Sequence, residues 1–243
     1  MIIKYFSNIV KASRIAWNII VFGLKTILLS DNKRDAKFYL YAKRWGQNLL
    51  NIVGAKMQII GLENINPQQS YVFVANHSNL FDIPIMQASI PNDFRIIYKK
   101  ELEKVPFFGL VMKKSPYIAT KRDASKSTLG SIDQAINQIQ KGASILVFPE
   151  GTRSTDGTLG KFKRGAFMLA FHSGKPIVPV TIIGSNNIFP RSKFEFNPAR
   201  VRVIFEKPIP VDALHTKSDE IQFIELIHSK INENLKFRGV NAI

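Results

Sequence analysis

The sequence Tyr71-Val-Phe-Val-Ala-Asn-His77-Ser-Asn-Leu-Phe-Asp82 holds the clearest indication of the fold. Its first five residues are apolar and β-favouring, which is typical of a buried strand. A short polar turn follows, and the apolar residues of a helix begin at Ile83, directly after Asp82. The segment therefore predicts a strand, a turn and a helix, with His77 and Asp82 on either side of the turn.

The same alternation of strand and helix patterns continues through residues 56–243. Strands are predicted at 57–60, 71–75, 94–99, 116–119, 144–148, 177–183 and 201–206. Helices are predicted at 82–90, 106–114, 126–140, 164–173 and 218–235. Apolar strands that alternate with helices indicate an α/β domain with a largely buried sheet flanked by helices.

Residues 1–55 show helical periodicity and no strand pattern. At about 100° per residue, the polar residues of the first helix form one narrow stripe: Lys4, Ser7, Asn8, Lys11, Arg14, Asn18 and Lys25. Its remaining surface is apolar: Ile3, Phe6, Ile9, Val10, Trp17, Ile20, Leu24 and Leu28. A second helix over 35–53 completes an amphipathic helical pair.

A narrow cationic stripe on a wide apolar surface is typical of a helix that lies in a membrane interface. We therefore expect residues 1–55 to form a hairpin that associates with an anionic membrane surface. The alternative is an ordinary helix that packs on the core and leaves its lysines in solvent. The apolar run 15–29 contains Asn18 and Lys25 and is shorter than the roughly 20 residues of a spanning helix. No cleavage site follows it, so we expect no signal peptide and a peripheral or monotopic protein on the cytoplasmic face of the cell membrane.

Composition narrows the range of functions. The chain has 34 Lys+Arg against 18 Asp+Glu, a net charge of +16, which indicates nucleic acid, anionic lipid or a phosphorylated substrate as partner. Its basic residues are spread along the sequence without a recognised nucleic-acid-binding signature, which argues against nucleic acid. The absence of cysteine excludes disulfides, thiolate metal sites and an acyl-cysteine intermediate.

His77 and Asp82 follow a predicted strand, and ligands of open α/β sheets collect beyond strand ends. A neutral imidazole can take a proton from an alcohol, while a carboxylate on the other ring nitrogen fixes the tautomer. The alternative is that Asp82 caps its helix and His77 is a polar turn residue. The segment alone leaves the two interpretations equal. Since no Gly-x-Ser-x-Gly nucleophile motif is present, direct attack by a substrate hydroxyl is the simpler mechanism.

A second segment, Phe148-Pro-Glu-Gly151-Thr-Arg153-Ser154, follows the predicted strand 144–148. Gly151 permits a sharp turn, and the guanidinium of Arg153 can donate two hydrogen bonds to phosphate oxygens. Arg122, after the predicted strand 116–119, is another candidate phosphate contact. For Lys161 and Lys163 the favoured interpretation is a solvated basic face.

Four segments together resemble the 1-acyl-sn-glycerol-3-phosphate acyltransferase family. The segment 76–82 matches the Asn-His-x-x-x-x-Asp block of that family, and 148–154 matches its Phe-Pro-Glu-Gly-Thr-Arg block. Between them, Lys100-Glu101-Leu102 with Pro106, Gly109 and Arg122 resembles another block, and Ile177-Val-Pro179-Val180 resembles the last. The resemblance extends from Gly61 to Phe205.

The resemblance implies an α/β fold with helices around a mixed sheet, as in glycerol-phosphate acyltransferases. It implies that His77 is the general base and that Asp82 orients it. The implied phosphate site comprises Glu150, Gly151, Thr152 and Arg153, with Arg122 as a further contact. Lys121 stands where the family often has Asp and could replace Arg122 in that role. Pro179 would shape the acyl-chain side.

The implied reaction moves an acyl group from acyl-CoA or acyl-carrier protein to the sn-2 hydroxyl of lysophosphatidic acid, giving phosphatidic acid. The acyl thioester is a co-substrate, and no metal or bound cofactor is expected. One alternative is the same chemistry on another lysophospholipid or a lyso-ornithine lipid. Another is a membrane-bound protein with this fold but no catalysis, against which the intact His77 and Asp82 argue.

Overall fold

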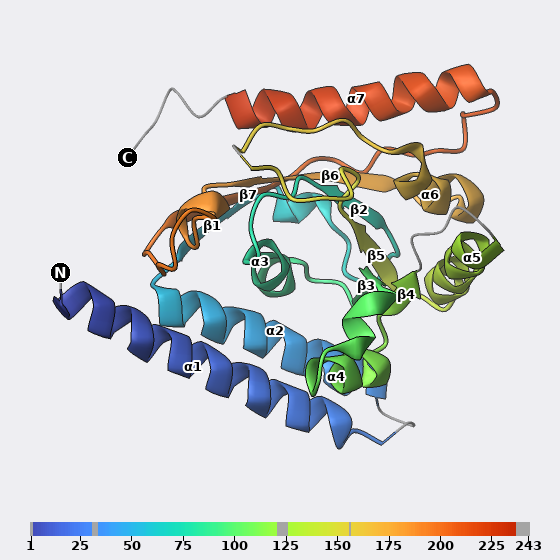
Figure 1. Ribbon diagram of the computed structural model, residues 1–243. Coiled ribbons are helices and arrows are strands. Elements are labelled where there is room, and N and C mark those ends of the chain that lie inside the picture. The colour runs from blue at the N-terminus through green and yellow to red at the C-terminus, as the bar shows by residue number, and fades with distance from the viewer. Residues whose placement is uncertain (1, 31–33, 121–125, 156, 237–243) are drawn as a thin grey trace.

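The computed structural model describes residues 2–30, 34–120, 126–155 and 157–236, which surround one seven-stranded sheet (Figure 1). Its strands are β1 (Lys56–Ile60), β2 (Val72–Ala75), β3 (Phe94–Lys99), β4 (Ile118–Thr120), β5 (Ser144–Val147), β6 (Ile177–Ile183) and β7 (Arg200–Phe205). All seven predicted strands are therefore confirmed, with small differences at their ends.

The strand order is β1-β7-β6-β2-β5-β3-β4. β6 and β7 are antiparallel, whereas the other neighbouring pairs are parallel. The predicted mixed sheet is thus confirmed. In the central pair, Val74 of β2 lies opposite Val147 of β5, so these two strands end side by side. The segments that leave them, 76–82 and 148–154, consequently start from the same edge of the sheet.

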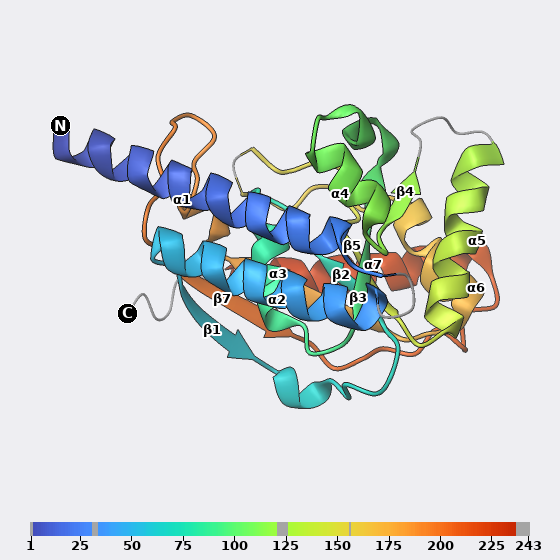
Figure 2. The same ribbon diagram turned by 90° about the horizontal axis from the view of Figure 1, so that it is seen from below.

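Helices cover both faces of the sheet (Figures 1 and 2). One side carries α1 (Ile2–Ile27), α2 (Arg34–Val53), α3 (Asp82–Ser89) and α4 (Phe108–Lys114), and the other carries α5 (Lys126–Gln140), α6 (Met168–Ser173) and α7 (Lys217–Lys236). Short 3-10 turns, η3 (Lys100–Lys104) and η4 (Arg164–Ala166), precede α4 and α6. The predicted helix 164–173 is therefore divided, because its first residues form the tighter turn.

The centre of the sheet is buried on both faces, as its apolar strands predict. On β2, Phe73 packs with α2 and α3, while Val72 and Val74 pack with α5, α6 and α7. This alternation follows from the two-residue period of a strand. The edge strand β1, by contrast, is mostly exposed.

The N-terminal helices form the predicted hairpin, but α1 keeps a wide apolar face exposed. Phe22 of α1 packs against Phe38 and Trp45 of α2, with ring centroids 5.7 and 5.2 Å apart. The exposed apolar side chains of α1 include Tyr5, Phe6, Ile9, Val10, Trp17, Ile20 and Leu24. An ordinary core helix with only its lysines in solvent does not match this exposure. Among the described residues, no helix combines the length and apolarity needed to cross a membrane.

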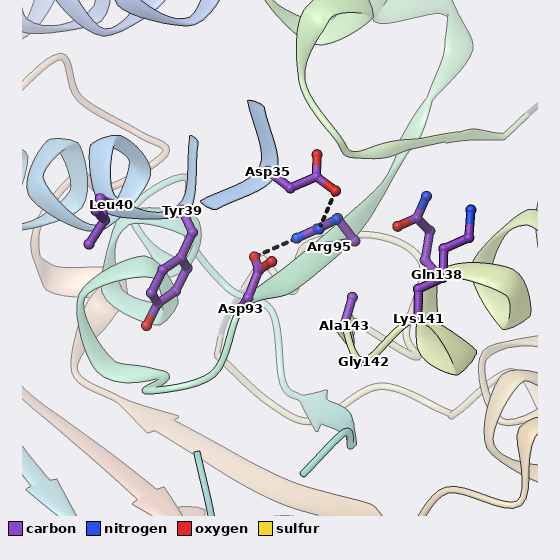
Figure 3. Close-up of a pocket in the computed structure, with 9 residues that line it drawn as sticks. All are labelled: Asp35, Tyr39, Leu40, Asp93, Arg95, Gln138, Lys141, Gly142 and Ala143. Atoms are coloured by element: carbon purple, nitrogen blue, oxygen red, sulfur yellow. Dashed lines mark hydrogen bonds and ion pairs between the residues drawn. The ribbon is translucent and has the colours of Figure 1, made fainter. Parts of the chain in front are cut away.

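Arg95, near the start of β3, fastens α2 to the amino end of the sheet (Figure 3). Its guanidinium pairs with Asp93 and, at 3.0 Å, with Asp35 at the start of α2. Burial raises the pKa of Asp93, and the adjacent Arg95 opposes this shift. With Tyr39, these residues line a cavity of about 640 Å³ at the strand ends opposite His77.

Candidate active site

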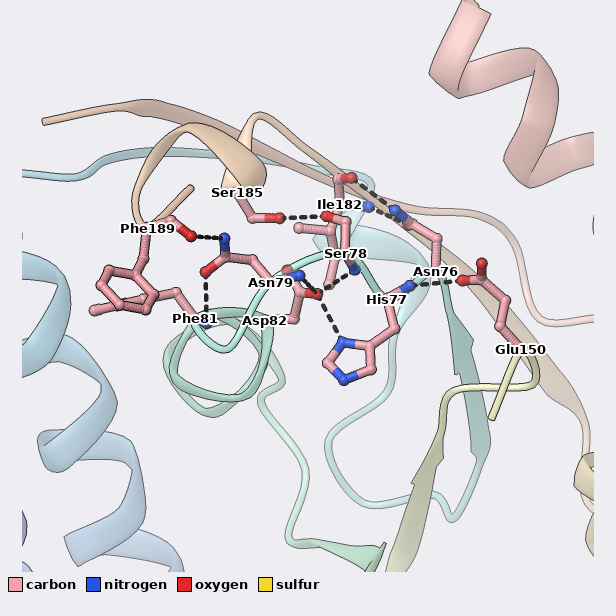
Figure 4. A network of polar contacts seen from close by, with 10 residues as sticks. All are labelled: Asn76, His77, Ser78, Asn79, Phe81, Asp82, Glu150, Ile182, Ser185 and Phe189. Atoms are coloured by element: carbon pink, nitrogen blue, oxygen red, sulfur yellow. Dashed lines mark hydrogen bonds and ion pairs between the residues drawn. The ribbon is translucent and has the colours of Figure 1, made fainter. Parts of the chain in front are cut away.

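His77 and Asp82 converge across the turn that joins β2 to α3 (Figure 4). His77 Nδ1 lies 2.8 Å from Asp82 Oδ2. The Asp82 side chain is completely buried, whereas 18% of the His77 side chain is exposed. The structure therefore brings together the two residues that the sequence singled out, with the histidine on the solvent side.

The carboxylate of Asp82 organises the turn that precedes it. Its Oδ2 also accepts the backbone N–H groups of Ser78 at 2.7 Å and Asn79 at 2.8 Å. These bonds run back toward the histidine, so Asp82 does more than begin its own helix. Because an ionised carboxylate only accepts hydrogen bonds, Nδ1 of His77 carries the ring proton. Nε2 is left with a lone pair, as a general base requires.

Asn76 anchors the exit of β2. Its side chain is buried and bonds both backbone groups of Ile182 in β6, donating to the carbonyl at 2.9 Å and accepting from the N–H at 2.7 Å. Two residues after Asn76, the hydroxyl group of Ser78 lies 3.1 Å from that of the buried Ser185. The amide of Asn76 thus continues the β2–β6 pairing by one residue and fixes the point from which His77 projects.

The loop after β5 holds His77 from the other side. The Phe148 ring stacks on the imidazole, with centroids 4.2 Å apart and planes inclined by 21°. The backbone N–H of His77 donates to Glu150 Oε1, and its carbonyl accepts the N–H of Ser154, both at 2.8 Å. The histidine is therefore held at its ring and at both backbone groups.

Glu150 is buried, and both of its carboxylate oxygens are occupied by backbone amides. While Oε1 faces His77, Oε2 accepts the N–H of Gly160 at 2.8 Å. A Cβ on residue 160 would lie 3.0 Å from Oε2, so glycine allows this close approach. The expected contact between Glu150 and a phosphate does not follow from this geometry. The carboxylate instead joins the loop to the turn that carries His77.

A largely apolar cavity of about 710 Å³ opens beside His77. Phe22 and Trp45 from the hairpin and Phe107 and Val111 from the region of α4 contribute to its wall. His77, Gly151, Thr152 and Arg153 are also among the residues that line it. An apolar space with a histidine and an arginine on its wall suits a ligand with a hydrocarbon chain and an anionic group.

Pro179, which was expected on the acyl-chain side, does not line this cavity. Pro179 pairs with Val74 inside the sheet and lies on the same strand face as Ile177, which packs in the cluster below α7. Its position therefore gives it no part in the cavity wall. Lys121 and Arg122 lie outside the described residues.

The segment 189–196, between β6 and β7, contacts and supports the turn that joins β2 to α3. Asn79 donates from its side-chain amide to the carbonyl of Phe189 at 2.9 Å. The Phe81 ring meets the Phe196 ring edge to face, with centroids 6.3 Å apart. The sequence carried no indication of this support, because neither contact follows from spacing along the chain.

The polar stripe of α1 binds this same segment. Phe196 donates its N–H to the Asn8 side chain at 3.0 Å and accepts a bond from Lys11 Nζ at 2.7 Å, while Lys4 pairs with Glu195 at 2.9 Å. Two of the cations expected to face a membrane thus face the protein. The apolar surface of α1, rather than Lys4 and Lys11, is what remains free.

Two residues of the quoted segments make supporting contacts that the sequence did not predict. Asn76 precedes His77 and Phe148 precedes the loop of Glu150 and Arg153, yet no structural role was predicted for either residue. An amide directly after a buried strand and an aromatic residue at the end of its neighbour are the signals that could have identified them. The contact of Asn76 depends on the pairing of β2 with β6, and that of Phe148 depends on the pairing of β2 with β5.

The family model described as Acyltransferase matches residues 56–183. A chloroplastic 1-acyl-sn-glycerol-3-phosphate acyltransferase of Brassica napus is 35% identical over 193 residues, which cover 79% of this chain and 56% of that protein. The 1-acyl-sn-glycerol-3-phosphate acyltransferase of Pseudomonas aeruginosa is 28% identical, over 82% of this chain and 77% of its own. This chain thus spans about half the length of the chloroplastic relatives it matches.

The fold is also similar to that of a solved structure. The crystal structure of the 1-acyl-sn-glycerophosphate acyltransferase PlsC from Thermotoga maritima superposes with a TM-score of 0.81 over 99% of both chains, at 24% sequence identity. The similarity includes the N-terminal helices as well as the sheet.

Proposed function

The chain belongs to the acyltransferase family, and on this basis we propose that it transfers a fatty acyl group from an acyl thioester to the sn-2 hydroxyl of 1-acyl-glycerol-3-phosphate. The observation that carries the proposal is the His77–Asp82 pair, which stands at a largely apolar cavity also lined by Arg153. The donor is acyl-CoA or acyl-carrier protein, and the product is phosphatidic acid.

In the proposed reaction, Nε2 of His77 takes the proton of the acceptor hydroxyl, and the oxygen attacks the thioester carbonyl. Asp82 stabilises the imidazolium that forms. The tetrahedral intermediate then collapses, the C–S bond breaks, and the leaving thiolate takes a proton from the imidazolium. The apolar cavity holds an acyl chain, and none of these steps calls for a metal or a bound cofactor.

Arg153 is proposed to bind the acceptor phosphate, with Gly151 and Thr152 forming the tip of the loop around it. Arg122 or Lys121 is proposed as a further phosphate contact from the family resemblance alone. Glu150 is proposed to act indirectly, because its carboxylate holds the backbone of His77.

The experiment that tests this function is an assay of thiol release from acyl-CoA and from acyl-carrier protein, with and without lysophosphatidic acid. Release that depends on the acceptor and yields phosphatidic acid supports the proposal and identifies the donor. If lysophosphatidic acid stimulates release from neither donor, while another lysophospholipid or a lyso-ornithine lipid does, the acceptor assignment is wrong.

Replacing Arg153 by alanine should lower kcat/KM for lysophosphatidic acid by about 10²-fold, since charge-assisted hydrogen bonds each contribute about 1.5–3 kcal/mol. Transfer to monoacylglycerol, which has no phosphate, should be unchanged. Steady-state kinetics on both acceptors check this result, with Arg191→Ala, at an exposed position between β6 and β7, as the control. Equal losses on the two acceptors would contradict the phosphate role.

The exposed apolar face of α1 is proposed to bind the anionic lipid surface on the cytoplasmic side of the membrane, so that residues 1–55 act as a membrane-associating unit attached to the catalytic domain 56–243. Aromatic and aliphatic side chains gather on this face, including Trp17, which is 68% exposed. Burial of such side chains in the interface would supply the binding free energy.

Leu24→Ser should weaken binding to anionic vesicles about 10- to 100-fold, because burying a leucine contributes about 1.5–3 kcal/mol. Leu226→Ser is the matched control, since Leu24 and Leu226 are 48% and 45% exposed and Leu226 lies on α7, across the sheet. Vesicle co-sedimentation measures both variants. If they bind equally well, α1 is not the membrane-contact surface.

A further inference from the structure

The side chain of Lys163 lies directly against Gly151 at the edge of the candidate active site. A Cβ placed on residue 151 would be 2.6 Å from Lys163 Nζ, 3.3 Å from Cε and 3.4 Å from Cδ. The backbone N–H of Lys163 donates to the carbonyl of Pro149 at 2.9 Å, which fixes this part of the chain on the loop. The ammonium group is therefore beside a residue that lines the cavity together with His77 and Arg153.

Glycine at position 151 is required for this approach. Its φ of +72° lies in the left-handed region, where other residues are strained by about 1–2 kcal/mol, and a side chain would meet the lysine. Gly151 therefore lets the loop turn and lets the ammonium come close to its tip. Lys163 is exposed, as its interpretation as part of a solvated basic face predicts, but that interpretation does not include the contact with Gly151.

Arg153 and Lys163 place two cationic side chains at the loop tip. In the part of the chain that the structure describes, neither Lys163 nor Arg153 forms an ion pair with a carboxylate. The nearby carboxylate of Glu150 accepts bonds from two backbone amides instead. Two cations on one loop surface, beside an apolar cavity, form an electrostatic environment that favours a multiply charged anion.

A phosphate monoester carries about −1.5 to −2 charges at pH 7, whereas a phosphate diester carries one. The single positive charge of Arg153 can balance the charge of a diester, whereas the two positive charges of Arg153 and Lys163 match the charge of a monoester. We infer that Lys163 is a second cation for the acceptor's phosphate and makes the site selective for phosphomonoester acceptors. This inference rests on the proposed function and extends it from phosphate binding to the choice between classes of lysolipid.

The test is Lys163→Met, which removes the charge and keeps an unbranched side chain against Gly151. We expect kcat/KM for lysophosphatidic acid to fall about 10- to 100-fold, through KM, because the loss is that of a charged hydrogen bond. The loss for lysophosphatidylglycerol, a diester, should be a few-fold at most, and monoacylglycerol should be unaffected. Lys163→Arg should restore most of the activity on lysophosphatidic acid.

Lys161→Met is the matched control, because Lys161 is an exposed lysine two residues earlier and the change alters net charge equally. The pH dependence gives a second readout. As the pH falls through about 6, the monoester loses its second charge, so the ratio of wild-type to Lys163→Met kcat/KM should approach that for the diester. Contributions from His77 cancel in this ratio because both proteins retain it.

Equal losses on all three acceptors would overturn the inference and leave Lys163 as a packing residue for the loop. No loss on lysophosphatidic acid would leave it as a solvated lysine. Equilibrium binding of lysophosphatidic acid and lysophosphatidylglycerol to the wild type and both methionine variants tests the same preference without turnover. Monoester-selective binding that Lys163→Met abolishes, in a protein without acyl transfer, would support the inference while the proposed reaction fails.

Discussion

Replacing His77 by alanine should lower kcat of acceptor-dependent acyl transfer by about 10²- to 10⁴-fold, the usual contribution of a general base. The expected loss is in kcat rather than KM, because Nε2 acts on the hydroxyl proton during the reaction and the cavity wall is otherwise retained. Thiol release at saturating lysophosphatidic acid measures this effect.

His172→Ala is the appropriate control. His172 is exposed on α6, and its Nδ1 lies 2.9 Å from the carbonyl oxygen of Met168 in the same helix. Near-normal turnover by the His77 variant, in a sample with a native circular dichroism spectrum, would show that another group takes the proton.

Two substitutions of Asp82 should separate its catalytic and structural tasks. Asp82→Asn can still accept bonds from the turn, yet it no longer stabilises an imidazolium, so kcat should fall about 10²- to 10⁴-fold while the fold is retained. Asp82→Ala should also destabilise the protein, because the buried N–H groups of Ser78 and Asn79 lose their acceptor. At about 1–3 kcal/mol for each unsatisfied donor, the free energy of unfolding should drop by about 2–6 kcal/mol.

The expected decrease for Asp82→Ala is a large part of the free energy of unfolding of a typical domain, which is roughly 5–15 kcal/mol. Urea unfolding measures it, and the exposed Asp133→Asn on α5 provides a control for loss of a carboxylate. If Asp82→Asn kept full activity, the carboxylate would be a structural element of the turn alone. If Asp82→Ala were as stable as the wild type, the three hydrogen bonds to Oδ2 would contribute little.

The sequence predicted the parts of this fold that depend on local periodicity. Buried strands such as 71–75 are apolar throughout, and a turn that begins directly after such a strand must lie at a sheet edge. The proximity of His77 to Asp82 could also be predicted from the sequence, since both residues belong to one short connection. The amphipathic pattern of α1 likewise depends only on its own residues.

The remaining features depend on contacts between distant segments. Glu150 is 73 positions from His77 along the chain, and its carboxylate binds that backbone only because β2 and β5 are neighbours. Lys4 and Lys11 of α1 were expected to face lipid because periodicity identifies a polar stripe but not the segment that contacts it. Lys163 is exposed, as predicted, but no local pattern indicated that its side chain lies against Gly151.

The segment 189–196 has a practical consequence for work on shortened forms of this protein. It holds Asn79 and Phe81 of the catalytic turn on one side and is itself held by Asn8 and Lys11 on the other. A truncation that starts after α1 would therefore remove the residues that hold this segment in place, at the same time as it removes the apolar face of α1. Low activity in such a truncated form would report on a loosened turn as much as on lost lipid contact, whereas single substitutions such as Leu24→Ser leave Asn8 and Lys11 in place.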